Sequence, residues 1–230
     1  YSNRNGVQRD FLKAKNYFEL AAKLNDSNAL VNLGYLYYNG YGVPRDYLRA
    51  IHLYKLAAQS NNSEALVNLG GIYEDGIYVE QNYKLAKEYY ELAAEQNNSN
   101  ALYQLGNLYF HGFGVKQDYL KAKKYLELSS QSHNSDALLA LGIMYENGNG
   151  VEKDYLQARD YYELSAKLNN SEALFYLGNI YSTGDVFDID ITKACHYYQK
   201  CIEIHDQKIV NYNSKEKSYS SYFKYNKFFY

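Results

Sequence analysis

The sequence predicts an all-α protein, a right-handed αα superhelical solenoid of stacked helix hairpins. Three observations predict it: the chain repeats itself every 36 residues, apolar residues recur at helical spacing within each copy, and no segment alternates as a half-buried strand does. The stretch "YYNGYGVPRDYLRA" at 37–50 returns as "YFHGFGVKQDYLKA" at 109–122 and as "YENGNGVEKDYLQA" at 145–158. A single phosphate-binding or catalytic loop would not recur in this way, so these glycines are interpreted as architectural.

The first helix of each unit is expected to begin at a serine. In "SNALVNLGYLYYNG", Ser27 can accept a hydrogen bond from a free backbone N–H and so cap the helix. Four apolar residues and a glycine then follow at helical spacing, and every later copy keeps them: Ala29, Leu30, Leu33, Gly34 and Tyr37. The helix should stop at Gly40, because glycine tolerates the left-handed conformation that closes a C-terminus.

The second helix of each unit is expected to begin after an aspartate and to end in a short turn. Asp46 is a natural N-cap, and the helix should end near Ser60, with Asn61 left-handed in the turn. In the corresponding column Asn82 replaces the aspartate. Asparagine caps a helix as well as aspartate does but cannot act as a general acid or base, so the column is interpreted as capping.

The repeat also sets the expected organisation of the chain. Residues 1–26 are an incomplete N-terminal repeat that holds a loop and a second helix, 27–203 are five full repeats, and 204–230 form an aromatic, basic C-terminal cap or tail. Tyr1 aligns with the last turn of a first helix, so we expect that further residues precede it. Four Asn-x-Ser sequences, at Asn25, Asn61, Asn97 and Asn169, would accept glycans in a secretory compartment, but the capping serine also explains them.

Composition limits the classes of partner. The formal net charge is −2, which offers no basic excess for a nucleic acid backbone, and no apolar run approaches the ~18 residues of a membrane span. Cys195 and Cys201 are six residues apart, about 240° around a helix, so a metal site or a disulfide is not expected. The five histidines stand in columns that are polar in other repeats and are expected at the surface: His52, His111, His133, His196 and His205.

The combined pattern resembles a known repeat family. Gly-x-Gly-Val-x-x-Asp-(x)3-Ala-(x)2-Tyr-Tyr-(x)2-Ala-Ala, followed by Ala-(x)3-Leu-Gly-(x)2-Tyr-(x)2-Gly, is similar to the SEL1-like repeat, a relative of the tetratricopeptide repeat, over about residues 1–203. The resemblance implies a non-enzymatic scaffold or adaptor with no cofactor, as in quality-control complexes of the secretory pathway and in bacterial signalling or surface proteins. A cysteine-rich branch of the family supplies the alternative, a hydrolase, but its repeat-by-repeat disulfides are missing here.

Function is expected where the repeats differ, on the part of the first helices outside the apolar stripe. The resemblance places this face on the concave side, where rings beside amides would suit a peptide or protein partner. The candidate partner-binding residues are Tyr35, Tyr38, Asn68, Tyr103, Gln104, Asn107, Phe110, Phe175, Tyr176 and Asn179. Tyr103 and Phe110, seven residues apart, are the predicted anchors. The alternative for several of these residues is that they pack against the adjacent repeat.

Overall fold

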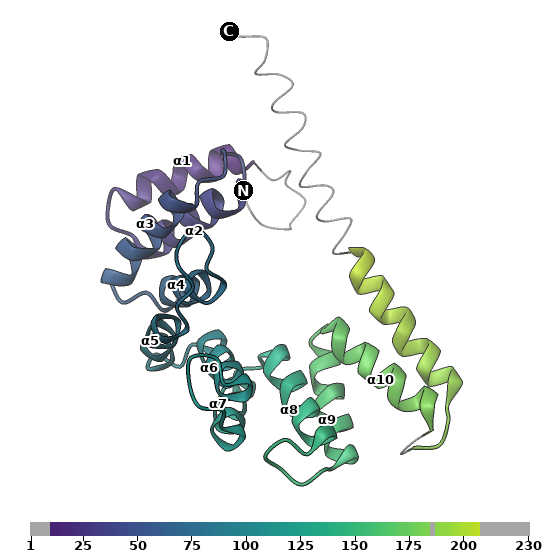
Figure 1. Ribbon diagram of the computed structural model, residues 1–230. Coiled ribbons are helices and arrows are strands. Elements are labelled where there is room, and N and C mark those ends of the chain that lie inside the picture. Colours follow the sequence, from purple (N-terminus) through teal and green to yellow (C-terminus); the bar gives the residue numbers. More distant parts are fainter. Residues whose placement is uncertain (1–9, 185–186, 208–230) are drawn as a thin grey trace. The chain divides into compact units, whose positions relative to one another are not determined.

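A computed structural model describes residues 10–184 and 187–207 of the chain, and these residues form helices and connecting turns, with no strand among them (Figure 1). The helices in order are α1 (Phe11–Ala22), α2 (Ser27–Asn39), α3 (Tyr47–Gln59), α4 (Ser63–Asp75), α5 (Tyr83–Ala94), α6 (Ser99–His111), α7 (Tyr119–Gln131), α8 (Ser135–Asn147), α9 (Tyr155–Lys167) and α10 (Ser171–Thr183). An eleventh helix, here called the final helix, covers 191–207.

The helices pair as the repeat predicts, and the chain forms two compact units, residues 1–101 and 102–230. In the first unit α2 packs on α3 and α4 packs on α5; in the second, α8 packs on α9. Each of these pairs is the first and second helix of one repeat, and contacts such as α3 with α4 and α9 with α10 join consecutive repeats. The prediction of an all-α solenoid of 36-residue hairpins is confirmed.

The second helices begin as predicted. The side chain of Asp46 accepts a hydrogen bond from the backbone N–H of Arg49 at 2.9 Å, and Asn82 accepts one from Leu85 at 3.0 Å. Aspartate and asparagine therefore do the same work in this column, which confirms the capping interpretation. The turns after the second helices are also as expected, because Asn61 has a φ of 55°.

The N-caps of the first helices differ from the prediction. The capping side chain is not Ser27 but Asp26 before it, and in the next repeat Oδ1 of Asn62 accepts from the backbone N–H groups of Glu64 and Ala65, both at 3.1 Å. Nδ2 of the same Asn62 donates to Ser27 Oγ of the preceding repeat at 3.1 Å. An amide carries its donor and its acceptor on separate atoms, so one side chain caps α4 with Oδ1 while Nδ2 binds the start of α2.

Close approach of the helices within a repeat requires the glycine that recurs inside each first helix. A Cβ on Gly70 would lie 2.4 Å from Cε1 of the Tyr90 ring, which is fully buried in α5. Gly40, by contrast, is needed for its backbone, because its φ of 71° closes α2 in the left-handed conformation, as predicted. Packing and chain reversal thus explain two of the glycine columns.

The ends of the chain are only partly described. α1 is the second helix of the incomplete repeat at 1–26, and residues 1–9 before it lie outside the described residues. The final helix continues to 207, four residues past the repeat boundary expected at 203, and most of the segment predicted as a cap or tail, 208–230, lies outside the described residues.

Candidate binding face on the first helices

The first helices of consecutive repeats lie side by side at their N-termini. In the first unit Asn62, at the start of α4, donates to Asn28 Oδ1 of α2 at 2.9 Å. In the second unit Asn170, at the start of α10, donates to Asp136 Oδ1 of α8 at 2.8 Å. The faces of these helices that point away from their own second helices therefore form a common surface within each unit.

Two of the ten candidate residues are exposed rings. Tyr35 on α2 is 47% exposed, and Phe175 on α10 is 50% exposed. Tyr35 has the Tyr41 ring 5.6 Å away, and Phe175 has the Tyr198 ring at 6.0 Å, centroid to centroid. Both rings keep about half of their surface available to a partner.

The amide candidates are half-buried and are partly held by local hydrogen bonds. Asn107 Nδ2 donates to Gln104 Oε1 at 3.3 Å, so two neighbouring amides on α6 are oriented together. Asn179 Oδ1 accepts from the Tyr198 hydroxyl at 2.7 Å, which ties it to the final helix. Asn68 on α4 is likewise half-buried. These amides combine a fixed orientation with partial exposure.

The remaining four candidates pack inside the protein. Tyr103 and Phe110 are half-buried against the core cluster that contains Leu126 and Leu141, the second of which belongs to the next repeat. Tyr38 meets the Tyr47 ring edge-on at 5.1 Å, and Tyr176 stacks on Tyr162 at 5.0 Å. These four rings are therefore half-buried against neighbouring side chains, which agrees with the packing alternative.

Two glutamates on the same face accept hydrogen bonds from buried tyrosines. The buried Tyr90 donates its hydroxyl to Glu74 Oε2 at 2.6 Å, and Tyr162 donates to Glu146 Oε2 at 2.5 Å. Burial first, and then the hydrogen bond to Glu74, raise the pKa of the Tyr90 hydroxyl. Sequence reasoning missed this role, and the pairing of residue types does not signal it, because Tyr54 and Tyr198 hold the same place on their second helices without a glutamate on the first.

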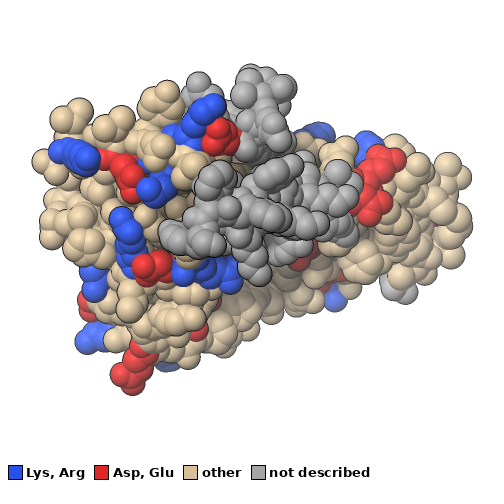
Figure 2. All heavy atoms as spheres, turned by 90° about the horizontal axis from the view of Figure 1, so that it is seen from above, with Lys and Arg blue, Asp and Glu red and all other residues tan. Residues whose placement is uncertain are grey.

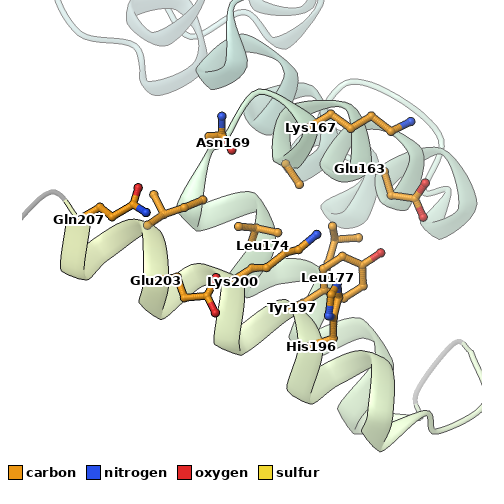
Figure 3. Close-up of a pocket in the computed structure, with 12 residues that line it drawn as sticks. Glu163, Lys167, Asn169, Leu174, Leu177, His196, Tyr197, Lys200, Glu203 and Gln207 are labelled. Atoms are coloured by element: carbon orange, nitrogen blue, oxygen red, sulfur yellow. The ribbon is translucent and has the colours of Figure 1, made fainter. Parts of the chain in front are cut away.

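A cleft of about 560 Å³ lies between α9, α10 and the final helix (Figure 3). The buried side chains of Leu174 and Leu177 line it, together with Lys167 and Glu163 from α9 and with Lys200, His196 and Glu203 from the final helix. No hydrogen bond or ion pair joins the side chains of these residues, which are all described. The cleft therefore offers mixed charge around an apolar floor and no paired acid and base.

The other residues considered for chemistry are dispersed. All five histidines are exposed, as predicted, and Cys195 and Cys201 are free thiols. Among the described residues no three His, Cys, Asp or Glu side chains gather in a way that could hold a metal ion. Figure 2 shows acidic and basic side chains interspersed on the face in view.

Comparison with known families identifies the repeat. The family model described as Sel1 repeat matches residues 1–26, 27–62, 63–98, 99–134, 135–170 and 171–203. The chain belongs to the Sel1 repeat family. The resemblance seen in the sequence is thereby confirmed, and Sel1 repeat proteins are commonly scaffolds for protein–protein interaction.

Solved Sel1 repeat structures support the same fold. A Sel1 repeat protein from Oxalobacter formigenes is 31% identical with a TM-score of 0.80, over 86% of this chain and 81% of that one. The protective antigen c5321 of uropathogenic Escherichia coli is 30% identical with a TM-score of 0.59, over 86% of this chain and 50% of that one. This chain thus spans about half of the antigen's length.

A further likeness concerns the fold alone. The immunity protein Pa5087 of Pseudomonas aeruginosa is 23% identical, with a TM-score of 0.63, over 86% of this chain and 76% of that one. No curated protein matches the chain. In the part of the chain that the structure describes, no helix has both the length and the apolar character needed to cross a membrane.

Proposed function

We propose that this Sel1 repeat chain is a non-enzymatic scaffold that binds a peptide or protein partner through the exposed face of its first helices. The composition of that face is the observation that carries the proposal: an exposed ring and an amide stand on α2 beside a second amide, Asn68, on α4, and a ring and an amide stand together again on α10. Primary amides donate and accept hydrogen bonds and so match the main chain of an extended peptide. Exposed rings supply contact area at low cost in conformational entropy.

The first unit gives the clearest pairing of these groups. Asn32 on α2 is exposed, and its Nδ2 donates to the Asn28 carbonyl at 2.8 Å, which fixes the side chain. Tyr35 lies one turn further along α2, and Asn68 holds the place of Asn32 on α4. A peptide laid across α2 and α4 would meet two amides and one ring.

The proposal assigns no catalytic residue and no cofactor. Nothing in the comparisons supports the hydrolase alternative, whose basis was the disulfide-bonded branch of the family. The Sel1 repeat fold is generally a non-enzymatic scaffold. The four candidate rings that pack against neighbouring helices are not among the proposed contact residues. Tyr35, Phe175 and the amides are the groups proposed to touch the partner.

The test uses a random peptide library displayed on phage and the intact chain as bait. Enriched peptides are synthesised with a fluorophore, and their affinity is measured by fluorescence anisotropy. Asn68→Ala and Tyr35→Ala should each weaken binding about tenfold or more, as interface anchors do. Lys55→Ala, at an exposed position on the second helix α3, is the matched control and should bind as the wild type does. Failure to enrich any peptide, or equal affinity of all variants, would contradict the proposal.

A further inference from the structure

The second helices of the second unit expose leucines for which no packing role is found. Leu120 and Leu128 on α7 are 70% and 39% exposed, and Leu156 and Leu164 on α9 are 57% and 47% exposed. Eight residues along an α-helix complete two turns and about 80° more, so each pair of leucines lies on one side of its helix. Leucines exposed on one side of a helix leave apolar surface that a partner can cover.

The two leucine pairs belong to one surface, because α7 and α9 are neighbours. Tyr161 of α9 packs against the core cluster that contains Leu126 of α7. Glu127 and Lys123 of α7 are also close enough to Tyr161 to act on the pKa of its hydroxyl, which burial raises. Since α7 and α9 hold the same place in consecutive repeats, their exposed leucines project from the same side of the layer of second helices.

A charged residue lies midway between the leucines of each helix, and the two charges have opposite sign. Lys124 stands between the leucines of α7; it is exposed and makes no ion pair with the described residues. Asp160 stands between those of α9, with its side chain 63% exposed and bound by Arg159 at 2.9 Å. We name this surface, made of Leu120, Lys124, Leu128, Leu156, Asp160 and Leu164, the leucine face.

We propose that the leucine face binds the leucine face of a second copy of this chain, so that two chains form a twofold dimer. In a face-to-face dimer the axis lies in the plane of contact and runs either across the helices or along them. An axis across the helices would set Lys124 against the partner's Lys124. An axis along them sets Lys124 against the partner's Asp160, and Asp160 against the partner's Lys124. Like charges in contact oppose the first arrangement, so the second is selected.

The same arrangement matches the leucines. With the axis along the helices, α7 lies parallel to α9 of the other copy, and equivalent positions of the repeat face each other. Leu120 then meets the partner's Leu156, and Leu128 meets the partner's Leu164. Apolar residues flank each ion pair on both sides and reduce its contact with water, which strengthens the attraction between the charges.

Other second helices lack this combination. On α1 and α3 the residue between the leucines is Asn16 or His52, in place of a lysine or an aspartate. On α5 Lys84 replaces the first leucine, and on the final helix Lys200 replaces the second. Two leucine pairs around opposite charges occur only on α7 and α9 among the described second helices. The proposed dimer uses the opposite layer from the proposed peptide-binding face and does not depend on it.

Sedimentation velocity of the full chain, from about 1 to 200 µM, tests the proposal. The wild type should show a reversible monomer–dimer equilibrium. Lys124→Glu and Asp160→Lys should each raise the dissociation constant about tenfold or more, because symmetry makes each substitution convert two attractive pairs into two repulsive ones. The double variant restores both pairs with exchanged signs and should return to within about threefold of the wild type.

A pair of leucine variants controls for general effects. Leu120→Glu should abolish the dimer, whereas Leu48→Glu, at the same repeat position on α3 and 68% exposed, should leave it intact. Far-ultraviolet circular dichroism should show the same helicity for all variants, since the substituted side chains are exposed. A wild type that stays monomeric overturns the proposal, and so does a double variant that fails to recover dimerisation. Monomers that bind anionic phospholipid vesicles through Leu120 would assign the face to a membrane and overturn it as well.

Discussion

The hydrogen bond between Tyr90 and Glu74 offers a quantitative test of how the repeats are stabilised. Tyr90 is fully buried, and its hydroxyl donates to Glu74 at 2.6 Å. Glu74→Leu leaves a buried donor without this acceptor, which should cost about 1–3 kcal/mol of unfolding free energy. Tyr90→Phe removes the donor instead and should cost about 1.5 kcal/mol, the low end for a bond to a charged group, because the half-buried carboxylate can be hydrated.

The double variant separates the bond from the packing. An apolar pair at these positions is already present in the third repeat, where Leu126 is the second-helix residue and Phe110 the first-helix residue. Tyr90→Phe with Glu74→Leu should therefore cost less than the sum of the single changes by about 1–2 kcal/mol. Denaturant unfolding at neutral pH, followed by circular dichroism, measures each value. Tyr89→Phe is the control, because its ring stacks on Tyr73 at 5.7 Å and should keep that contact.

Additivity would refute this reasoning. If the double variant loses the sum of the single losses to within about 0.5 kcal/mol, the hydroxyl and the carboxylate are not coupled. A Glu74→Leu variant as stable as the wild type would show that the buried hydroxyl has another acceptor of equal strength. Either result would remove the explanation for the paired occurrence of tyrosine and glutamate in this repeat.

Three further expectations follow from the same geometry. Gly70→Ala should lower the free energy of unfolding by about 1–3 kcal/mol, because its Cβ would lie 2.4 Å from the Tyr90 ring. Gly71→Ala should raise it by up to about 1 kcal/mol through helix propensity, because its Cβ would lie 3.8 Å from the Tyr90 hydroxyl. Thermal unfolding compares the two variants, and equal effects would contradict the close contact at Gly70. Asn62→Ser should retain the helix cap but lose the bond to Ser27, which should lower the free energy of unfolding by about 0.5–1.5 kcal/mol. Asn62→Ala also removes the cap and should cost about 1 kcal/mol more. A serine variant as stable as the wild type would count against a contribution from the bond to Ser27. Burial raises the pKa of eight described tyrosine hydroxyls. The stability that their protonated form contributes is therefore complete below the pKa of about 10 in the unfolded chain, and it is lost as the pH rises beyond that value. A melting temperature that stays constant between about pH 9 and 12 would contradict this expectation.

Local signals predicted the elements of the repeat with few errors. The second-helix caps, the left-handed Gly40 and the turn at Asn61 all depend on residues within a few positions of each other, so short-range rules were sufficient. The one local error was the cap at Ser27. It arose because Asp26 and Ser27 can each cap a helix. In the structure Ser27 instead accepts a hydrogen bond from Asn62, 35 residues away.

The exposure of the candidate residues was predicted less well, because burial there depends on the neighbouring repeat. Tyr103 and Glu74 both stand outside the apolar stripe of their own helix, and the sequence alone leaves open whether such residues are exposed or pack against a neighbour. In the structure Tyr103 packs against the next repeat, and Glu74 binds a buried hydroxyl of its own repeat. The exposed Leu120 and Leu156 stand outside the apolar stripe of the second helices, and the sequence analysis assigned them no role.

The sequence by itself determined the family, the 36-residue unit, its two helices and most of their ends, because a strict period repeats the same short-range signals many times. Only the tertiary structure decided which side chains remain available to a partner. A helix in a solenoid is covered from two directions, by the other helix of its own repeat and by the adjacent repeats. The first contact can be predicted from the helical period of apolar residues, whereas the second depends on how successive repeats stack. The exposure of Tyr35, Phe175 and the leucine face is therefore known only from the packed structure.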